Sequence, residues 1–149
     1  MDVFEEITAA AGRESPLWAA AVLPTELRQP TAVFSPLAPA PFELGLETVY
    51  EAYLVHYGRP RLFAPDGETE RILLGDYLYA HGLVRIADAG GVDAVAAMAE
   101  LISRCAALRA RGSPGDGEAW VDAACSLGGE PAPLAVERAL ERHLARVEA

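Results

Sequence analysis

One stretch of the sequence, residues 69–88, constrains the fold most, because it holds the longest helical pattern in the chain. When successive residues are placed 100° apart, most of its apolar side chains fall on one side of a helix. That side comprises Ile72, Leu73, Tyr79, Ala80, Leu83, Val84 and Ala87. We expect it to be the buried face of a central helix over residues 70–88. Asp76 lies in the same stripe, and we expect a buried carboxylate with a partner, because an unpaired buried charge is too costly.

Two glycines, Gly75 and Gly82, lie seven residues apart in this stretch, which is close to two helical turns. A glycine inside a helix costs about 1 kcal/mol relative to alanine. A pair along one edge is useful where another helix passes too close to leave room for a side chain. The spacing therefore predicts a close helix–helix contact at these two positions.

Further helical patterns follow one another along the chain, separated by glycine and proline. The expected helices cover residues 2–11, 17–23, 41–57, 92–111, 118–127 and the segment from 133 onward. No strand pattern is longer than four residues, and a chain of 149 residues fits one domain. We therefore predict an all-α fold, a single-domain helical bundle of about six helices spanning residues 1–149.

Five prolines fall in residues 24–41, between the second and third expected helices. Proline lacks a backbone N–H group and moves the preceding residue out of the helical region. We expect a proline-rich N-terminal crossover that is extended, apart from one helical turn near residues 25–29. Its apolar side chains should pack it onto the bundle. They are Val33, Phe34, Leu37 and Phe42.

The overall charge and the cysteines limit the classes of function. All twelve basic residues are arginine, and the formal net charge of −10 argues against binding of nucleic acid or of an anionic membrane surface. The sequence contains no run of 18 apolar residues, so we expect no transmembrane segment. Its first residues are acidic, unlike a signal peptide. Cys105 and Cys125 lie in apolar helical patterns, which favours reduced thiols in a cytoplasmic protein.

Common catalytic and metal-binding motifs are missing from the sequence. It has no H-E-x-x-H, C-x-x-C or G-x-S-x-G motif and no glycine-rich phosphate loop. His56, His81 and His143 are far apart, and none has a second ligand four residues later. We therefore expect no catalytic residues, no metal and no cofactor.

Residues 45–90 resemble the middle of the trans-polyprenyl diphosphate synthases, an all-helical, magnesium-dependent family. The resemblance is carried by Gly58-Arg59-Pro60 and by the run Gly-Asp-Tyr-Leu-Tyr-Ala at residues 75–80, with a similar spacing between them. In that family an aspartate-rich motif precedes the first element. Here the corresponding helix has only Glu47 and Glu51, and no second aspartate-rich motif follows. Magnesium bound to a diphosphate needs several carboxylates on one face.

The resemblance without the metal motifs implies a non-catalytic helical subunit or interaction protein, a candidate partner of an isoprenoid-diphosphate synthase. We expect a homo- or hetero-oligomer formed through an exposed apolar helix face.

Two alternatives remain open. The first is a protein that binds an apolar, isoprenoid-like molecule between its helices, with tyrosines as polar contacts. The candidate ligand-binding residues are Tyr53, Tyr57, Arg59, Asp76, Tyr77 and His81. The second is an enzyme on a divergent isoprenoid-synthase scaffold that uses Asp76 with His81, or the acids at residues 66–70. Asp76 and His81 are five residues apart, about 140° around a helix, so they would need a further group from another helix.

Overall fold

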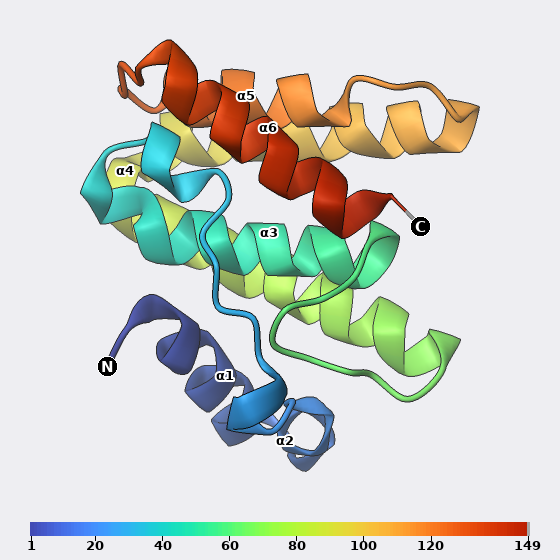
Figure 1. The fold of residues 1–149 in the computed structure, drawn as a ribbon. Helices are drawn as coiled ribbons and strands as arrows, with labels where there is room; N and C mark the ends of the chain where they lie inside the picture. The colour runs from blue at the N-terminus through green and yellow to red at the C-terminus, as the bar shows by residue number, and fades with distance from the viewer. Residues whose placement is uncertain (149) are drawn as a thin grey trace.

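Six α-helices make up the computed structural model, which describes residues 1–148 (Figure 1). They are α1 (Val3–Glu14), α2 (Pro16–Ala21), α3 (Glu43–Tyr57), α4 (Glu68–Arg111), α5 (Asp116–Ser126) and α6 (Pro133–Val147). Three short 3₁₀ helices lie between α2 and α3: η1 (Thr25–Leu27), η2 (Ser35–Leu37) and η3 (Ala40–Phe42). Over the described residues no strand occurs beyond a single bridge between Val22 and Phe63. The all-α prediction is confirmed.

The centre of the fold is α3, and not the helix over residues 70–88 that the sequence pattern favoured. Every residue of α3 from Gly45 to Val55 is buried. Figure 1 shows α3 in the middle of the molecule, with α1 and α2 on one side and α5 and α6 on the other. Its sequence is apolar on several faces, which is typical of a helix surrounded by protein.

The close contact predicted at Gly75 and Gly82 is present, and α3 is the neighbouring helix. A methyl group at Gly82 would lie 2.6 Å from Cγ2 of Val49, and one at Gly75 would overlap the imidazole of His56. From the α3 side, a methyl group at Gly45 would lie 2.7 Å from Cδ1 of Ile86. Glycines on both helices therefore allow α3 and α4 to lie unusually close together.

The buried face of the first half of α4 is not the one predicted. The residues that pack inward are Leu74, Gly75, Leu78, Gly82 and Ile86. Ile72, Leu73 and Val84 are exposed, and so is Asp76, whose side chain is 65% exposed. The prediction was wrong because this stretch has two apolar sides. The side that packs on α3 is the one that contains the glycines.

The helix α4 changes direction at Gly91, where the sequence predicted a break between two helices. Gly91 has φ 72° and ψ −160°, a conformation that residues with a side chain rarely adopt. The half of α4 before Gly91 packs against α3, and the half after it packs against α5 (Figure 1).

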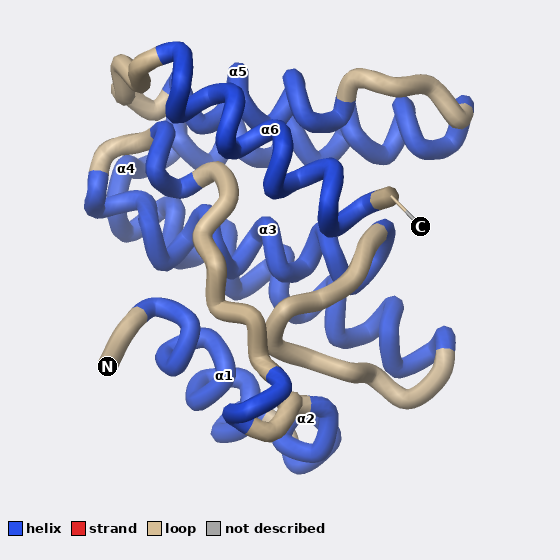
Figure 2. Tube along the Cα trace, viewed as in Figure 1, coloured by secondary structure: helices blue, strands red, loops and turns tan. Residues whose placement is uncertain are grey.

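The crossover between α2 and α3 is less extended than predicted. Each of its three 3₁₀ turns has a proline within it or directly before it. The segment between η1 and η2 runs as an open loop (Figure 2). Leu23 donates its backbone N–H to the carbonyl of Leu62 at 2.9 Å, which joins the crossover to the α3–α4 loop. The four predicted anchors, Val33, Phe34, Leu37 and Phe42, are all buried in the main core. In residues 1–148, no helix is both long and apolar enough to cross a membrane.

Candidate functional site

The six candidate ligand-binding residues do not meet in one place. Tyr53 and Tyr57 lie together near the end of α3, and the guanidinium of Arg109 lies 5.6 Å and 5.5 Å from their two ring centres. Arg59 is an exposed residue of the following loop. Its backbone carbonyl accepts a hydrogen bond from Nη2 of Arg146 at 2.7 Å.

Asp76, Tyr77 and His81 lie on α4, but they face different neighbours. Oδ1 of Asp76 lies 3.4 Å from Nε2 of His56, a half-buried residue that stacks on Tyr79. Burial lowers the pKa of His56, while the charge of Asp76 opposes that shift. Asp76 therefore has a partner, as expected, but the prediction that its carboxylate is buried was wrong because its side of α4 faces outward.

Tyr77 and His81 form a separate pair one helical turn apart. The Tyr77 hydroxyl lies 2.9 Å from Nδ1 of His81, and the Tyr77 ring stacks on Trp18 of α2. Burial lowers the pKa of His81, and the nearby Arg85 lowers it further. Tyr77 thus contacts Trp18 of α2, whereas Asp76 contacts His56 of α3.

Asp116, at the start of α5, is the centre of a polar cluster that includes Tyr53. Oδ2 of Asp116 accepts hydrogen bonds from the Tyr53 hydroxyl at 2.6 Å, from Nη2 of Arg109 at 2.7 Å and from Nε2 of His143 at 2.9 Å. Burial alone would raise the pKa of Asp116, but hydrogen bonds from His143 and Tyr53 and the charge of Arg109 hold it well below its ordinary value. The carboxylate thus stays ionised and links α3, α4, α5 and α6.

His143 continues this network to Tyr50. Because Asp116 only accepts, His143 donates to it from Nε2, and Nδ1 of the same ring is hydrogen-bonded to the Tyr50 hydroxyl at 2.7 Å. Burial holds the pKa of Tyr50 far above its ordinary value, so its hydroxyl keeps its proton. His143 and Asp116 also line a pocket of about 460 Å³ between α5 and α6. The side chain of His143 is 1% exposed and each ring nitrogen contacts a protein group, so the imidazole presents little polar surface to that pocket.

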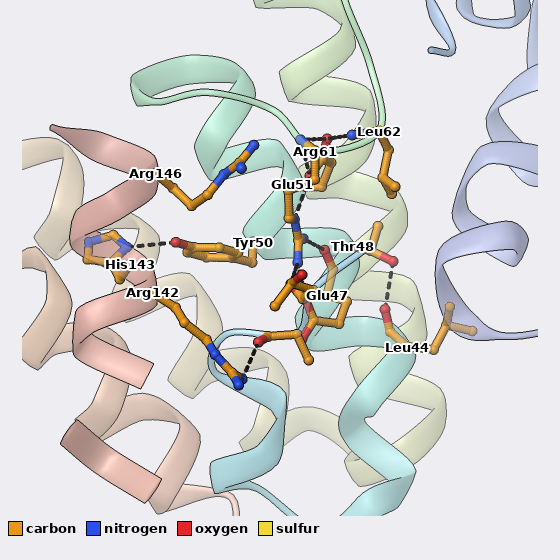
Figure 3. A network of polar contacts seen from close by, with 12 residues as sticks. Leu44, Glu47, Thr48, Tyr50, Glu51, Arg61, Leu62, Arg142, His143 and Arg146 are labelled. Carbon is orange, nitrogen blue, oxygen red and sulfur yellow. Dashed lines mark hydrogen bonds and ion pairs between the residues drawn. The ribbon is translucent and has the colours of Figure 1, made fainter. Parts of the chain in front are cut away.

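A second polar network lies inside the fold around Arg61 (Figure 3). Its guanidinium forms ion pairs with Glu47 at 2.6 Å and Glu51 at 3.0 Å, and all three side chains are at most 1% exposed. The attraction of the two carboxylates raises the pKa of Arg61, although burial alone would lower it. Thr31 adds a carbonyl acceptor at 2.8 Å. The network joins α3, the α3–α4 loop and the crossover.

Sequence reasoning missed both networks. A signal for the second was present, because Glu47 and Glu51 are two acids one turn apart on an otherwise apolar helix. We interpreted them only as an incomplete metal motif. For the Asp116 network no local signal exists, since residues from four helices build it.

Comparison with known proteins adds no relatives: no protein-family model, curated protein or solved structure matches this chain. Within residues 1–148, no group of three or more His, Cys, Asp or Glu side chains is arranged to hold a metal ion.

Proposed function

We propose that this protein is a non-catalytic helical subunit, which pairs with a different protein chain through one exposed side of α4. We call this side the α4 outer face and define it as Ile72, Leu73, Asp76, Ala80, Val84 and Ala87. The observation that carries the proposal is its apolar exposure. Ile72, Leu73 and Val84 are 46%, 51% and 58% exposed, on a helix whose opposite side is already buried against α3. Contiguous exposed apolar surface is typical of protein interfaces.

The charges favour a different protein, over a second copy of this chain, as the partner that covers the α4 outer face. The α4 outer face carries one charge, that of Asp76, and no basic residue. Two copies would bring two carboxylates into one apolar interface, and each chain has a formal net charge of −10. A helix with an apolar stripe and a lysine or arginine opposite Asp76 complements the face in both shape and charge.

The internal polar networks favour a binding role over catalysis. The ionised groups of both networks are paired with one another. The hydroxyl groups of Tyr50, Tyr53 and Tyr77 are hydrogen-bonded to His143, Asp116 and His81, respectively. A catalytic residue or a ligand-binding tyrosine needs a polar atom that is free to contact another molecule. These contacts therefore weigh against the enzyme alternative and against an isoprenoid-binding site built on these tyrosines.

The resemblance of residues 45–90 to trans-polyprenyl diphosphate synthases suggests the first partner to test, a catalytic chain of that class. A cytoplasmic setting is part of the proposal. Cys105 and Cys125 are both free thiols, which suits a reducing compartment.

The test is a comparison of the assembly state of three proteins. Light scattering gives the mass of the purified chain alone, and affinity purification from the native lysate recovers its complexes. The wild type is compared with Val84→Glu, which places a charge in the α4 outer face. The matched control is Leu27→Glu, because Leu27 is 60% exposed but lies in η1.

We expect a monomer in isolation and a defined complex from the lysate whose partner is helical. Val84→Glu should abolish the complex, while Leu27→Glu should leave it intact. A homodimer of the purified chain would overturn the choice of a different chain. Recovery of no partner, or of one that Val84→Glu still binds, would overturn the role of the α4 outer face.

A further inference from the structure

A second pocket lies between the crossover and α6, away from the α4 outer face. It has a volume of about 430 Å³, and three arginines line it. The principal lining residues are Gln29, Thr31, Val33, Arg61, Arg142 and Arg146. No carboxylate is among the lining residues, although the chain as a whole is strongly acidic. The pocket thus gathers three of the twelve arginines of the protein on one small surface.

The three arginines differ in how far their charges are balanced. Arg61 forms its ion pairs with Glu47 and Glu51 beneath the pocket. Within the described residues, neither Arg142 nor Arg146 has a carboxylate within ion-pair distance. Two guanidinium groups therefore line the pocket with no carboxylate of residues 1–148 within ion-pair distance.

Arg146 is held in place by neutral acceptors. It donates to the carbonyls of Arg59 and Pro60 at 2.7 Å and 3.0 Å, and to the side-chain amide oxygen of Gln29. Burial lowers the pKa of Arg146, and repulsion by Arg61 and Arg59 lowers it further against the attraction of Glu51. A bound anion would relieve this repulsion.

Arg142, one turn earlier on α6, supplies the free donors. A guanidinium has five N–H groups. One of those on Arg142 donates to the carbonyl of Ala32 at 3.1 Å, which leaves four without a partner among the described residues (Figure 3). The planar arrangement of these groups suits the oxygen atoms of a phosphate. Ala145, which is exposed, and the almost fully buried Val33 form an apolar wall beside them.

We propose that this pocket binds the phosphate group of a small molecule, with Arg142 and Arg146 as its direct contacts. The charge of Arg61 is balanced by Glu47 and Glu51, so Arg142 and Arg146 supply the positive charge for the anion. The apolar wall contacts the uncharged part of the ligand. The proposal uses none of the residues of the α4 outer face, so either proposal can fail without the other.

Isothermal titration calorimetry at constant ionic strength tests the proposal, with inorganic phosphate, phenyl phosphate and acetate as probes. The variant is Arg142→Gln, which removes the free donors of an exposed residue. The matched control is Arg138→Gln, because Arg138 is an exposed arginine one turn earlier on α6 that does not line the pocket. Thermal unfolding of each variant confirms that it is folded.

We expect saturable binding of inorganic phosphate and tighter binding of phenyl phosphate. Acetate should bind at least about tenfold more weakly than inorganic phosphate. Arg142→Gln should weaken phosphate binding at least about tenfold, while Arg138→Gln should not change it. The absence of saturable phosphate binding would overturn the proposal. Equal losses of phosphate affinity in Arg142→Gln and Arg138→Gln would also overturn it, because a general effect of charge would then explain them. Binding of acetate as tight as that of phosphate would overturn it as well.

Discussion

Arg61 donates to the carboxylate of Glu51 from two positions, its backbone amide at 2.9 Å and its Nε at 3.0 Å. This pair of bonds brings the loop after α3 back onto the side of α3. Glu47, one turn earlier, accepts from Nη1 of the same guanidinium. Because all three charges are buried, the loop can hold this position only while the ion pairs are complete.

Replacement of Arg61 by methionine should therefore be strongly destabilising. The change leaves Glu47 and Glu51 buried without a cation. Removal of one partner of a buried ion pair lowers the free energy of unfolding by about 3–5 kcal/mol. Urea unfolding followed by circular dichroism measures the change in the free energy of unfolding.

Arg59→Met is the control for that experiment, because Arg59 lies in the same loop but is exposed. Its cost should stay within about 0.5 kcal/mol. Similar losses for the two variants would show that the buried charges do not determine the stability of the loop.

The sequence allowed the helices to be predicted far better than the side chains that meet between them. Periodicity and the breaks at glycine and proline depend on neighbouring residues, and they located the helices and the kink at Gly91. The contacts of Asp116 with His143 and Tyr53 depend on how three helices pack. No local pattern contains that information.

The buried side of α4 was mispredicted for a related reason. Size and hydrophobicity favoured the side with Ile72, Leu73 and Val84, whereas close packing selected the side with Gly75 and Gly82. The glycine spacing was the better indicator of the interface, because removal of a side chain allows α3 and α4 to approach each other.

Gly82→Ala should destabilise the protein, although alanine is the better helix former. Its methyl group would lie 2.6 Å from Cγ2 and 3.1 Å from the backbone nitrogen of Val49. Overpacking of this kind costs about 1–3 kcal/mol, which the gain in helix propensity of about 1 kcal/mol offsets only in part. Gly12→Ala is the comparison, since its methyl group would make an ordinary 3.7 Å contact with Ala19. Thermal unfolding should show a lower Tm for Gly82→Ala and an equal or higher Tm for Gly12→Ala.

The Asp116 network should make the stability of the protein sensitive to acid. The folded-state pKa of Asp116 lies below its unfolded value of about 3.9. Ionised Asp116 therefore contributes stability above that pH, and the contribution is lost as the pH falls from about 4 toward the folded-state pKa. Asp116→Asn should cost about 1.5–3 kcal/mol at pH 7 and flatten the loss of stability in acid. Urea unfolding between pH 7 and pH 3 measures both effects.

Asp122→Asn provides the matched control in α5, because the Asp122 side chain is 70% exposed. It should leave both the stability at pH 7 and its slope in acid close to those of the wild type. If Asp116→Asn retained the full acid dependence of the wild type, other carboxylates would have to be its source.

Two adjacent leucines of α4 give the most direct test of which side of the helix is buried. Leu74 is 0% exposed and packs against the core beside α3, whereas Leu73 is 51% exposed on the α4 outer face. Leu74→Ala should cost about 2–5 kcal/mol, because it leaves a cavity, and Leu73→Ala should change stability by less than about 0.5 kcal/mol. Both changes remove the same atoms from the same helix, so helix propensity cancels in the comparison. Equal costs in urea unfolding of the isolated chain would mean that the side with Leu73 is buried too, and the α4 outer face would then not be free for a partner.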